Sequence, residues 1–268
     1  MGLEATPAST RRAPRRRPGA PRSLVIASTA VLLFLLLWQA APPLGLVNGN
    51  YTSQPTLIFL AAVEVFRGDQ LGHHTWISFS EFFLGFALAF AVSIPLGLLL
   101  GVSRTARYLL DPPLMALYIA PSLILLPIMI IWLGIGIASK IAVVFLGVIF
   151  PIIVNTMAGM HEADANLVRA ARSFGAGPVD IFLRILIPGA LPSILLGIRL
   201  GVGRGVLGVV VGELYVSQAG LGYQMTTYGS SMRIDRLLVY VLIISFFGYA
   251  LTSFVRWLEG RVRNWKPA

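Results

Sequence analysis

Charged side chains inside an otherwise apolar segment are the first residues of this sequence that could do chemistry. Arg199, Arg204 and Glu213 interrupt Pro188–Val216, a segment in which Gly, Leu, Ile and Val predominate. A charge within a membrane is costly and usually faces a cavity or a partner. One hypothesis is that Arg199 or Arg204 lines a path that favours anions. The alternative is that both side chains reach toward the cytoplasmic headgroups, which suits Arg199 better than Arg204.

Glu213 lies near the outer end of the same segment, beside Tyr215 and Ser217. Two interpretations are open. Glu213 forms an ion pair with Arg233 or Arg236 that stabilises a gate, or it is a plain carboxylate at the outer interface. We therefore place Glu213, with the two arginines, among the candidate residues of a substrate pathway.

The histidines and lysines lack the spacing that metal or nucleotide binding requires. His73, His74 and His161 have no acidic or histidine neighbour at metal-ligand spacing, so we predict no metal site and place them at interfaces or in loops. Cysteine is absent, which excludes thiol catalysis. The phosphate-binding pattern of Gly, four residues, Gly-Lys and Ser or Thr has no match at Lys140 or Lys266, the only lysines. We predict no catalytic residue and no ATP hydrolysis on this chain, so a partner or an ion gradient must supply the energy.

The elements that position these residues are apolar helices. The chain has 268 residues, of which 56% are hydrophobic and 12% are charged, against about 25% charged residues in soluble domains. About 20 apolar residues cross the roughly 30 Å hydrocarbon core of a bilayer as a helix. We therefore predict an all-α transmembrane fold with six spans: Ser23–Ala41, Phe82–Val102, Pro113–Ser139, Ile141–Met160, Pro188–Val216 and Leu237–Val255.

The basic residues are distributed unequally between the two sides of these spans. The formal net charge is +10, which we attribute to the excess of Lys and Arg in cytoplasmic loops and not to nucleic-acid binding. One side receives Arg67, Lys140, Arg233 and Arg236. The other side, which we predict to be cytoplasmic and to hold both termini, receives Arg11, Arg12, Arg15, Arg16, Arg17, Arg22, Arg104, Arg107, Arg169, Arg172, Arg184, Arg256, Arg261, Arg263 and Lys266.

Composition divides the chain into three parts. Residues 1–22 are rich in Pro and Arg and are predicted to be a disordered cytoplasmic tail. Residues 23–258 form the predicted transmembrane domain, and residues 259–268 form a second cytoplasmic tail. The first apolar run exceeds the roughly 7–15 residues of a signal-peptide core, so we interpret it as an uncleaved span. An outer segment follows it, in which Pro55 is expected to open a short helix.

Prolines mark where the third span starts and bends. The sequence Asp111-Pro112-Pro113 indicates the start of that span. Pro121 and Pro127 are expected to bend it. Neighbouring helices or water must then satisfy the freed carbonyls, which tends to place the segment inside the bundle. Two interpretations stay open: these two prolines belong to the substrate pathway, or they only kink a packed helix.

Glycines recur at helical spacing in the fifth span, at Gly197, Gly201, Gly205, Gly208 and Gly212. Small residues at four-residue intervals let two helix backbones approach closely. We therefore predict a helix interface along this face. The pattern does not distinguish an interface within one subunit from one between two subunits.

The stretch His161–Ile187, between the fourth and fifth spans, has the pattern of a helix, a break and a second helix. Asp164 or Asn166 could cap the first helix, which is expected to stop at Gly175, and Pro178 can begin the second. An exposed helical hairpin of this kind offers a docking surface.

This hairpin resembles the EAA loop of bacterial ABC-importer permeases. That pattern runs Glu-Ala-Ala, three residues, Gly, nine residues, then Ile-x-Leu-Pro, and the spacing fits at every position. Arg169 replaces the Glu and Ile187 replaces the Leu. The resemblance implies that the ATPase-docking residues are Arg169, Ala170, Ala171, Arg172, Gly175, Ile185 and Pro188.

The resemblance extends from about Gln54 to Trp265 and is similar in pattern to the nitrate, sulfonate and taurine branch of these permeases. Glu81 departs from it, because that branch often has Arg there. The passages that carry the similarity are His74–Phe86, Pro95-Leu96-Gly97-Leu98, Asp111–Gly136, and Glu213 followed by Gly220-Leu221-Gly222-Tyr223.

The resemblance implies a six-helix type I ABC importer permease in the bacterial inner membrane, in contact with lipid. A homodimer of this chain would form the pathway, and two ATP-binding subunits would hold ATP and Mg, so this chain needs no cofactor. A periplasmic or extracellular binding protein would deliver a small anion such as a sulfonate, nitrate or related organic acid. The alternative is an ion-driven secondary transporter, which would need carboxylates or His within its spans; a membrane enzyme would need clustered polar groups.

Overall fold

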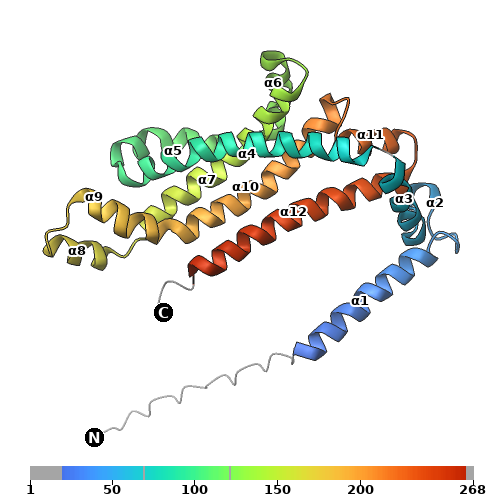
Figure 1. Cartoon of the computed structure of the whole chain (residues 1–268), viewed down its shortest axis with the longest axis horizontal. Coiled ribbons are helices and arrows are strands. Elements are labelled where there is room, and N and C mark those ends of the chain that lie inside the picture. Colours follow the sequence, from blue (N-terminus) through green and yellow to red (C-terminus); the bar gives the residue numbers. More distant parts are fainter. Residues whose placement is uncertain (1–19, 69, 121, 264–268) are drawn as a thin grey trace, which may run out of the picture. The chain divides into compact units, whose positions relative to one another are not determined.

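The computed structural model describes residues 20–68, 70–120 and 122–263, and every regular element in those ranges is a helix (Figure 1). The chain divides into two compact units between Thr56 and Leu57, and each unit is described by itself. Pro121 and most of the predicted tails, at residues 1–19 and 264–268, lie outside the described residues.

The first unit contains α1 (Ala20–Ala40), α2 (Gly49–Thr52) and the start of α3 (Pro55–Gly68). The predicted first span falls on α1, whose apolar part, Leu24–Ala40, is shorter than the long spans of the second unit. The helix that opens at Pro55 confirms the short helix predicted there.

Hydrogen bonds fold the segment after α1 back onto the end of that helix. Trp38 Nε1 donates to the Thr52 carbonyl at 3.4 Å, and Gln39 Nε2 donates to Gln54 Oε1 at 3.0 Å. The Gln39 side-chain oxygen also accepts from the backbone N–H of Thr56 at 3.2 Å. These contacts hold the end of α1 against the residues that open α3.

The second unit carries four helices that are long and apolar enough to cross a membrane: Leu71–Val102, Ile137–His161, Pro178–Tyr215 and Ile234–Val262. They confirm the predicted second, fourth, fifth and sixth spans. The elements of this unit after α3 are α4 (Leu71–Val102), α5 (Arg104–Ile119), η1 (Ser122–Leu125), α6 (Leu126–Leu133), α7 (Ile137–His161), α8 (Ala165–Ser173), α9 (Pro178–Ile181), η2 (Phe182–Leu186), α10 (Ile187–Val216), α11 (Leu221–Ser230) and α12 (Ile234–Arg263).

The limits predicted for the third span, Pro113–Ser139, are wrong, because α5 begins earlier and Ser139 belongs to α7. The apolar residues of this span lie in two helices, α5 and α6, that are bent by 84° at the break between them, in line with the bend predicted for it. Pro127 lies at the start of α6, where a missing N–H is tolerated. α6 ends at Leu133, and Gly134, with a φ of +77°, turns the chain toward α7.

The predicted helix start at Asp111-Pro112-Pro113 is also wrong, because α5 begins at Arg104 and both prolines lie inside it. The Ser103 side chain caps α5 by accepting the backbone N–H of Ala106 at 3.2 Å. A proline inside a helix leaves the carbonyl four residues earlier without its partner. Those carbonyls belong to Tyr108 and Leu109, whose side chains are exposed, so other groups can reach that surface.

α7 forms the centre of the bundle, packed along α4 on one side and α10 on the other, while α12 packs on α10. Val144, Val148 and Ile152 of α7 are completely buried. They join Phe82 of α4 and Val202 of α10 in one hydrophobic cluster. A central apolar helix of this kind is hydrophobic on all sides because every side contacts a neighbour.

The glycine face of α10 packs against α7 within the same chain. A Cβ atom at Gly205 would lie 2.9 Å from both Phe82 Cε2 and Val148 Cγ2, and one at Gly208 would lie 3.2 Å from the Cα of Val144. These distances leave no room for larger side chains, so the predicted helix interface lies inside one subunit.

Candidate functional site

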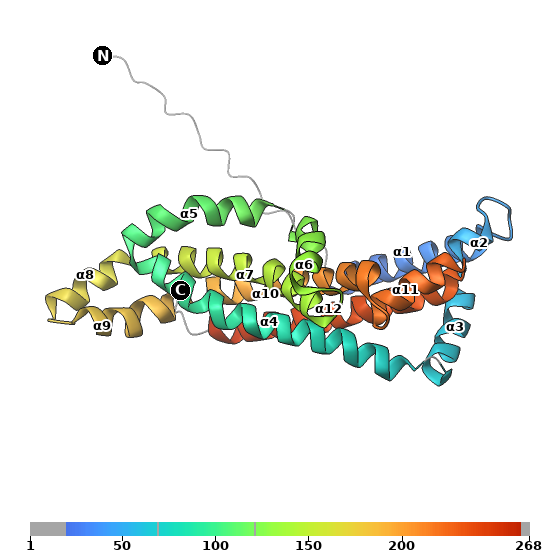
Figure 2. The same cartoon turned by 90° about the horizontal axis from the view of Figure 1, so that it is seen from above.

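An exposed hairpin of α8 and α9 extends from one end of the bundle, opposite the end that carries α11 (Figures 1 and 2). Asp164 begins it, because its side-chain oxygen accepts the backbone N–H of Asn166 at 2.8 Å. Of the two predicted caps, Asp164 is therefore the one used. α9 begins at Pro178, as predicted, where the first N–H of a helix has no partner to lose.

Gly175 ends α8 with a left-handed turn at a φ of +81°. Its N–H donates to the Arg172 carbonyl and the N–H of Ala176 donates to the Ala171 carbonyl, both at 3.0 Å. This pair of bonds is the Schellman motif that closes helix C-termini. Glycine adopts this φ without the steric cost that a Cβ atom brings. Gly175 therefore fixes the direction in which the chain leaves α8.

The predicted docking residues gather on this hairpin and the helix after it, with different exposures. Arg169 donates to Asn166 Oδ1 at 2.6 Å, one turn earlier on the exposed side of α8. A hollow of about 400 Å³ between the two helices is lined in part by Ala171, Gly175 and Ile185. Exposed members of the set are Arg169, Ala170, Arg172 and Gly175, and half-buried ones are Ala171, Ile185 and Pro188.

Phe174 is a residue of this surface that the sequence analysis missed. Its side chain is 92% exposed and lines the same hollow. The sequence signal for it is an aromatic residue directly before the glycine that ends a short polar helix. Such a helix offers the aromatic ring no apolar surface on which to be buried. A large apolar side chain held in solvent on a rigid turn is suited to insertion into a partner protein.

The hairpin is continuous with a span. η2 (Phe182–Leu186) is a π-helical turn, and the N–H of Ile187 donates to the Phe182 carbonyl five residues earlier. α9, η2 and α10 together form one helix that runs from Pro178 to Tyr215. No flexible linker therefore separates α9 from the long helix α10.

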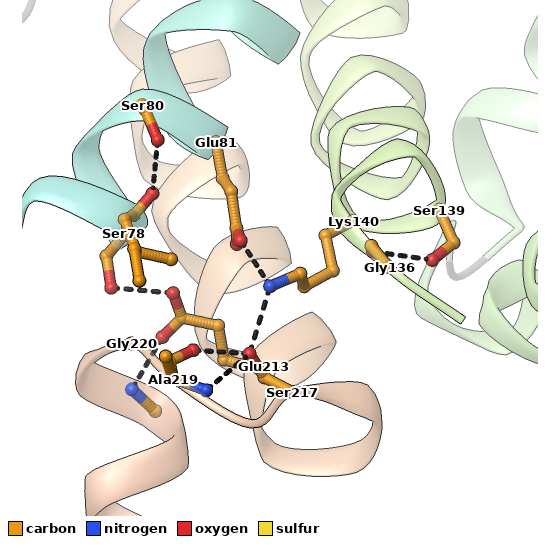
Figure 3. A network of polar contacts seen from close by, with 12 residues as sticks. Ser78, Ser80, Glu81, Gly136, Ser139, Lys140, Glu213, Ser217, Ala219 and Gly220 are labelled. Carbon is orange, nitrogen blue, oxygen red and sulfur yellow. Dashed lines mark hydrogen bonds and ion pairs between the residues drawn. The ribbon is translucent and has the colours of Figure 1, made fainter. Parts of the chain in front are cut away.

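A buried ionic network lies at the other end of α10 (Figure 3). The Lys140 ammonium of α7 pairs with the Glu81 carboxylate of α4, and their side chains are 6% and 0% exposed. Lys140 Nζ also donates to Ser217 Oγ at 2.9 Å. The expectation that Lys140 is an interfacial charge between two spans is wrong, because Ile137 begins α7 and places Lys140 in its buried first turn.

Glu213 belongs to the same network and is 1% exposed. Its carboxylate accepts the Ser78 hydroxyl and the N–H of Gly222, both at 2.6 Å. Both predicted interpretations of Glu213 are wrong, because it pairs with neither Arg233 nor Arg236 and is not at an interface. The turn at Gly220–Gly222 brings backbone donors to the carboxylate instead.

Arg236, the expected partner of Glu213, contacts another carboxylate. Its guanidinium lies 2.8 Å from Glu64 Oε2 of α3 and 5.4 Å from the ring centroid of Tyr228. α12 begins at Ile234, so Arg236 lies in its first turn, beside α11 and α3. The Arg236 charge at the start of α12 is therefore neutralised by Glu64, away from Glu213.

His74 adds a third side chain from α4 and is 8% exposed. Its Nδ1 accepts the N–H of Gly220 at 3.1 Å, and its Nε2 lies 2.5 Å from the terminal amide of Gln224. The expectation that His74 is interfacial is wrong. His74, Ser78 and Glu81 lie at intervals of four and three residues, which puts all three on one face of α4.

The two arginines of the fifth span have separate surroundings. Arg199 forms an ion pair with Glu259 of α12 at 3.1 Å. Arg204 donates to the Tyr118 carbonyl at 3.3 Å, and its guanidinium lies over the Tyr118 ring at 4.5 Å. Arg204 is exposed on the α5 side of α10, whereas Arg199 is half-buried against α12. The structure therefore does not bring them together.

The network holds two carboxylates and one ammonium group in a region that water barely reaches. Its contacts join α4, α7, α10 and the turn before α11, so it can clamp these helices at one end of the bundle. The chemistry open to these groups is positional, because the side chains of Glu81 and Glu213 are buried, at 0% and 1% exposure. Within the part of the chain that the structure describes, no group of three His, Asp or Glu is arranged to hold a metal ion.

A bundle of membrane-spanning helices, with an exposed hairpin rigidly joined to one span, defines a membrane-embedded transport subunit. Residues 93–264 match the model of the family described as binding-protein-dependent transport system inner membrane component. The chain belongs to this family.

Relatives and solved structures agree with this assignment. The chain is 32% identical to TauC of Escherichia coli (strain K12), named a taurine transport system permease protein, over 91% of this chain and 90% of the relative. It is also 32% identical to SsuC of Bacillus subtilis (strain 168), whose name refers to aliphatic sulfonates transport, over 94% and 90% of the two chains. A chain of the inward-facing MetNI methionine ABC transporter has the same fold, with a TM-score of 0.60 at 20% identity over 70% of this chain and 93% of that one.

Proposed function

We propose that this chain is the permease subunit of an ABC importer for small sulfonate-type anions. The observation that carries the proposal is the exposed α8–α9 hairpin, which continues without a linker into α10. The names of the relatives, which refer to taurine and aliphatic sulfonates, support the substrate class. Nitrate and related organic acids share the negative charge and belong to the same range of candidates.

The partners follow from the same proposal. Two ATP-binding subunits dock on the hairpins of two copies of this chain, and ATP and Mg are held by those subunits. A periplasmic or extracellular binding protein delivers the anion to the opposite side. The hairpin side and both termini are cytoplasmic, which the clustering of basic residues on that side supports.

The rigid surface of the hairpin inserts into the ATPase subunit. Ala170 and Ala171 allow close approach, Phe174 inserts into the ATPase, and Gly175 holds the turn between them. Closure of the ATPase subunits displaces α9 and, through the π turn, α10. Arg169 brings a guanidinium where the EAA pattern has a carboxylate, so the matching ATPase surface offers an acceptor such as a carboxylate or a carbonyl.

The pathway lies on the α5 side of α10 and attracts anions through Arg204. This side chain is exposed, and its charge has no carboxylate partner among the described residues. Tyr118 holds the guanidinium in place by cation–π and hydrogen-bond contacts. Arg199 is the weaker candidate, because Glu259 already neutralises it. The bend between α5 and α6 lies near this side and carries Pro127 at its far end.

The test compares two glycines of the hairpin in the reconstituted complex of permease, ATPase and binding protein. Gly175→Val places a Cβ atom at positive φ, where L-residues lose roughly 1–2 kcal/mol, and redirects the hairpin. Gly177→Ala is the matched control, because Gly177 has a φ of −72° and its nearest new contact would be 3.9 Å away. We measure the ATPase rate stimulated by the taurine-loaded binding protein.

The stimulated ATPase rate of the G175V complex should fall at least about tenfold, equivalent to 1.4 kcal/mol of coupling. The rate of the G177A complex should stay near that of the parent. The melting temperature of the G175V permease should fall by only about 2–8 °C, the effect of the roughly 1–2 kcal/mol backbone cost, and that of G177A should stay close to the parent. Uptake of taurine driven by a proton or sodium gradient, with no ATPase subunit present, would instead support the secondary-transporter alternative and end the proposal.

A further inference from the structure

A basic cavity lies at the hairpin end of the bundle, away from both the docking surface and the ionic network. Its volume is about 420 Å³, and its lining comes from the first two turns of α5 and the last residue of α7. The lining residues are Arg104, Arg107, Tyr108, Asp111, Pro112 and His161.

The charges of this cavity do not balance. Arg107 Nη1 lies 2.9 Å from His161 Nε2, and a guanidinium only donates, so Nε2 is the acceptor and the imidazole is neutral. Arg104 and Arg107 form no ion pair with any carboxylate of the described residues. With Asp111 as the one acidic residue in the lining, a single positive charge remains unmatched.

Asp111 shows what else the occupant must carry. Its carboxylate lines the cavity and forms no ion pair with any cation of the described residues. An ionised carboxylate only accepts hydrogen bonds, so a ligand that supplies an N–H or O–H donor at this point would be stabilised. The occupant therefore combines an oxyanion for the arginines with a donor a few ångströms away.

The surroundings favour an occupant that is attached to the membrane. α7 passes directly from His161 into the hairpin, so the cavity lies where a span emerges from the bilayer. Tyr108 and Leu109, beside the cavity on α5, are 81% and 70% exposed. These apolar side chains offer a surface for acyl chains, which a free ion would not use.

We propose that this cavity binds the headgroup of a phospholipid whose phosphate contacts Arg104 and Arg107 and whose ethanolamine or glycerol donates to Asp111. Phosphatidylcholine fits less well, because its quaternary ammonium has no hydrogen to donate. The bound lipid would fix the start of α5 against the end of α7. The site is independent of the transported anion and of the ATPase.

The experiment uses the purified full-length chain in detergent and native mass spectrometry, with titrated phosphatidylethanolamine, phosphatidylglycerol and phosphatidylcholine. Arg104→Gln should weaken binding of the first two lipids about tenfold, the size expected for losing one charge-assisted hydrogen bond. Arg184→Gln is the charge-matched control, because Arg184 is exposed on the hairpin and pairs with Asp180. That control should leave lipid binding unchanged.

A second variant tests whether an N–H or O–H donor of the lipid headgroup contacts Asp111. Asp111→Leu should abolish the preference for ethanolamine and glycerol lipids over phosphatidylcholine, while retaining phosphate-dependent binding through the arginines. Elution volume and melting temperature check that each variant is folded. Equal affinity of the parent for all three lipids would overturn the proposal. So would displacement of bound lipid by millimolar inorganic phosphate, which would assign the cavity to a soluble oxyanion.

Discussion

Removing the charge of Lys140 should destabilise the protein strongly, because no other cation of the described residues forms an ion pair with Glu81. Lys140→Met leaves the Glu81 side chain at 0% exposure without its ion-pair partner. Breaking a buried ion pair from one side costs about 3–5 kcal/mol. At about 2–4 °C per kcal/mol for a chain of this size, the melting temperature should fall by roughly 6–20 °C.

The assay is thermal unfolding of the purified chain in one detergent, followed by intrinsic tryptophan fluorescence. Lys140→Arg keeps the charge and should lose less than half as much. Arg67→Met removes an exposed charge and should change the melting temperature by little, as exposed pairs contribute about 0–1 kcal/mol. The double variant Glu81→Leu with Lys140→Met removes both charges and should be more stable than Lys140→Met alone.

The melting temperatures of the single and double variants together test whether the uncompensated Glu81 carboxylate causes the loss of stability. If Lys140→Met melts within about 2 °C of the parent, which corresponds to at most about 1 kcal/mol, the buried pair is not stabilising. If the double variant is as unstable as the single one, the loss comes from packing and not from an uncompensated carboxylate. Either result would refute the reasoning from burial and charge.

Three further outcomes follow from packing and exposure. Gly205→Leu should destabilise the chain by about 1–3 kcal/mol through overpacking. Gly203→Leu should not, because a Cβ atom at Gly203 would meet nothing within 4 Å. The melting temperatures of the two variants test this difference. Phe174→Ala should leave the melting temperature unchanged and weaken ATPase-subunit binding by on the order of thirtyfold, the effect of a lost aromatic anchor of about 2 kcal/mol; unchanged binding by surface plasmon resonance would exclude it as an anchor. Arg204→Gln should raise the KM for taurine uptake by reconstituted complex several-fold, and an unaltered KM and substrate preference would remove Arg204 from the pathway.

The hairpin could be predicted because its signals are local. Asp164, Gly175 and Pro178 each act on the backbone within a few residues, through a side-chain cap, a positive φ and a missing N–H. The long spans were predictable for a similar reason, since hydrophobic length alone defines them. The family pattern lies in the same stretch and depends on the spacing of Arg169, Gly175 and Pro188.

The buried network could not be predicted from the sequence, because its partners are distant in the chain. Ser78 and Glu213 are separated by 135 residues, and the pairing depends on how α4 and α10 pack on α7. The sequence offered Arg233 and Arg236 as nearer cations for Glu213, and proximity along the chain was the wrong guide. Glu81 was noticed only as a departure from the related branch.

The limits predicted for the third span are wrong for a different reason. Asp111-Pro112-Pro113 predicts a helix boundary, but the Ser103 cap starts α5 one residue later, at Arg104. A cap stabilises the first turn by about 1 kcal/mol, and the residues whose carbonyls the prolines leave free, Tyr108 and Leu109, are exposed. A rule that starts a helix at the nearest proline therefore places the start of α5 too far along the chain.

The π turn between α9 and α10 sets the rotational phase of one helix relative to the other. Each residue advances an α-helix by about 100°, so Ile181 and Ala190, nine positions apart, would point to opposite sides of an uninterrupted helix, about 180° apart. One additional residue in the turn reduces that angle to about 80°. Both side chains are buried, at 6% and 0% exposure, which requires them to face the bundle together. The π turn thus absorbs one inserted residue without changing which side of the helix faces the bundle, and deletion of one residue within Phe182–Leu186 would leave a regular α-helix with Ile181 and Ala190 still about 80° apart.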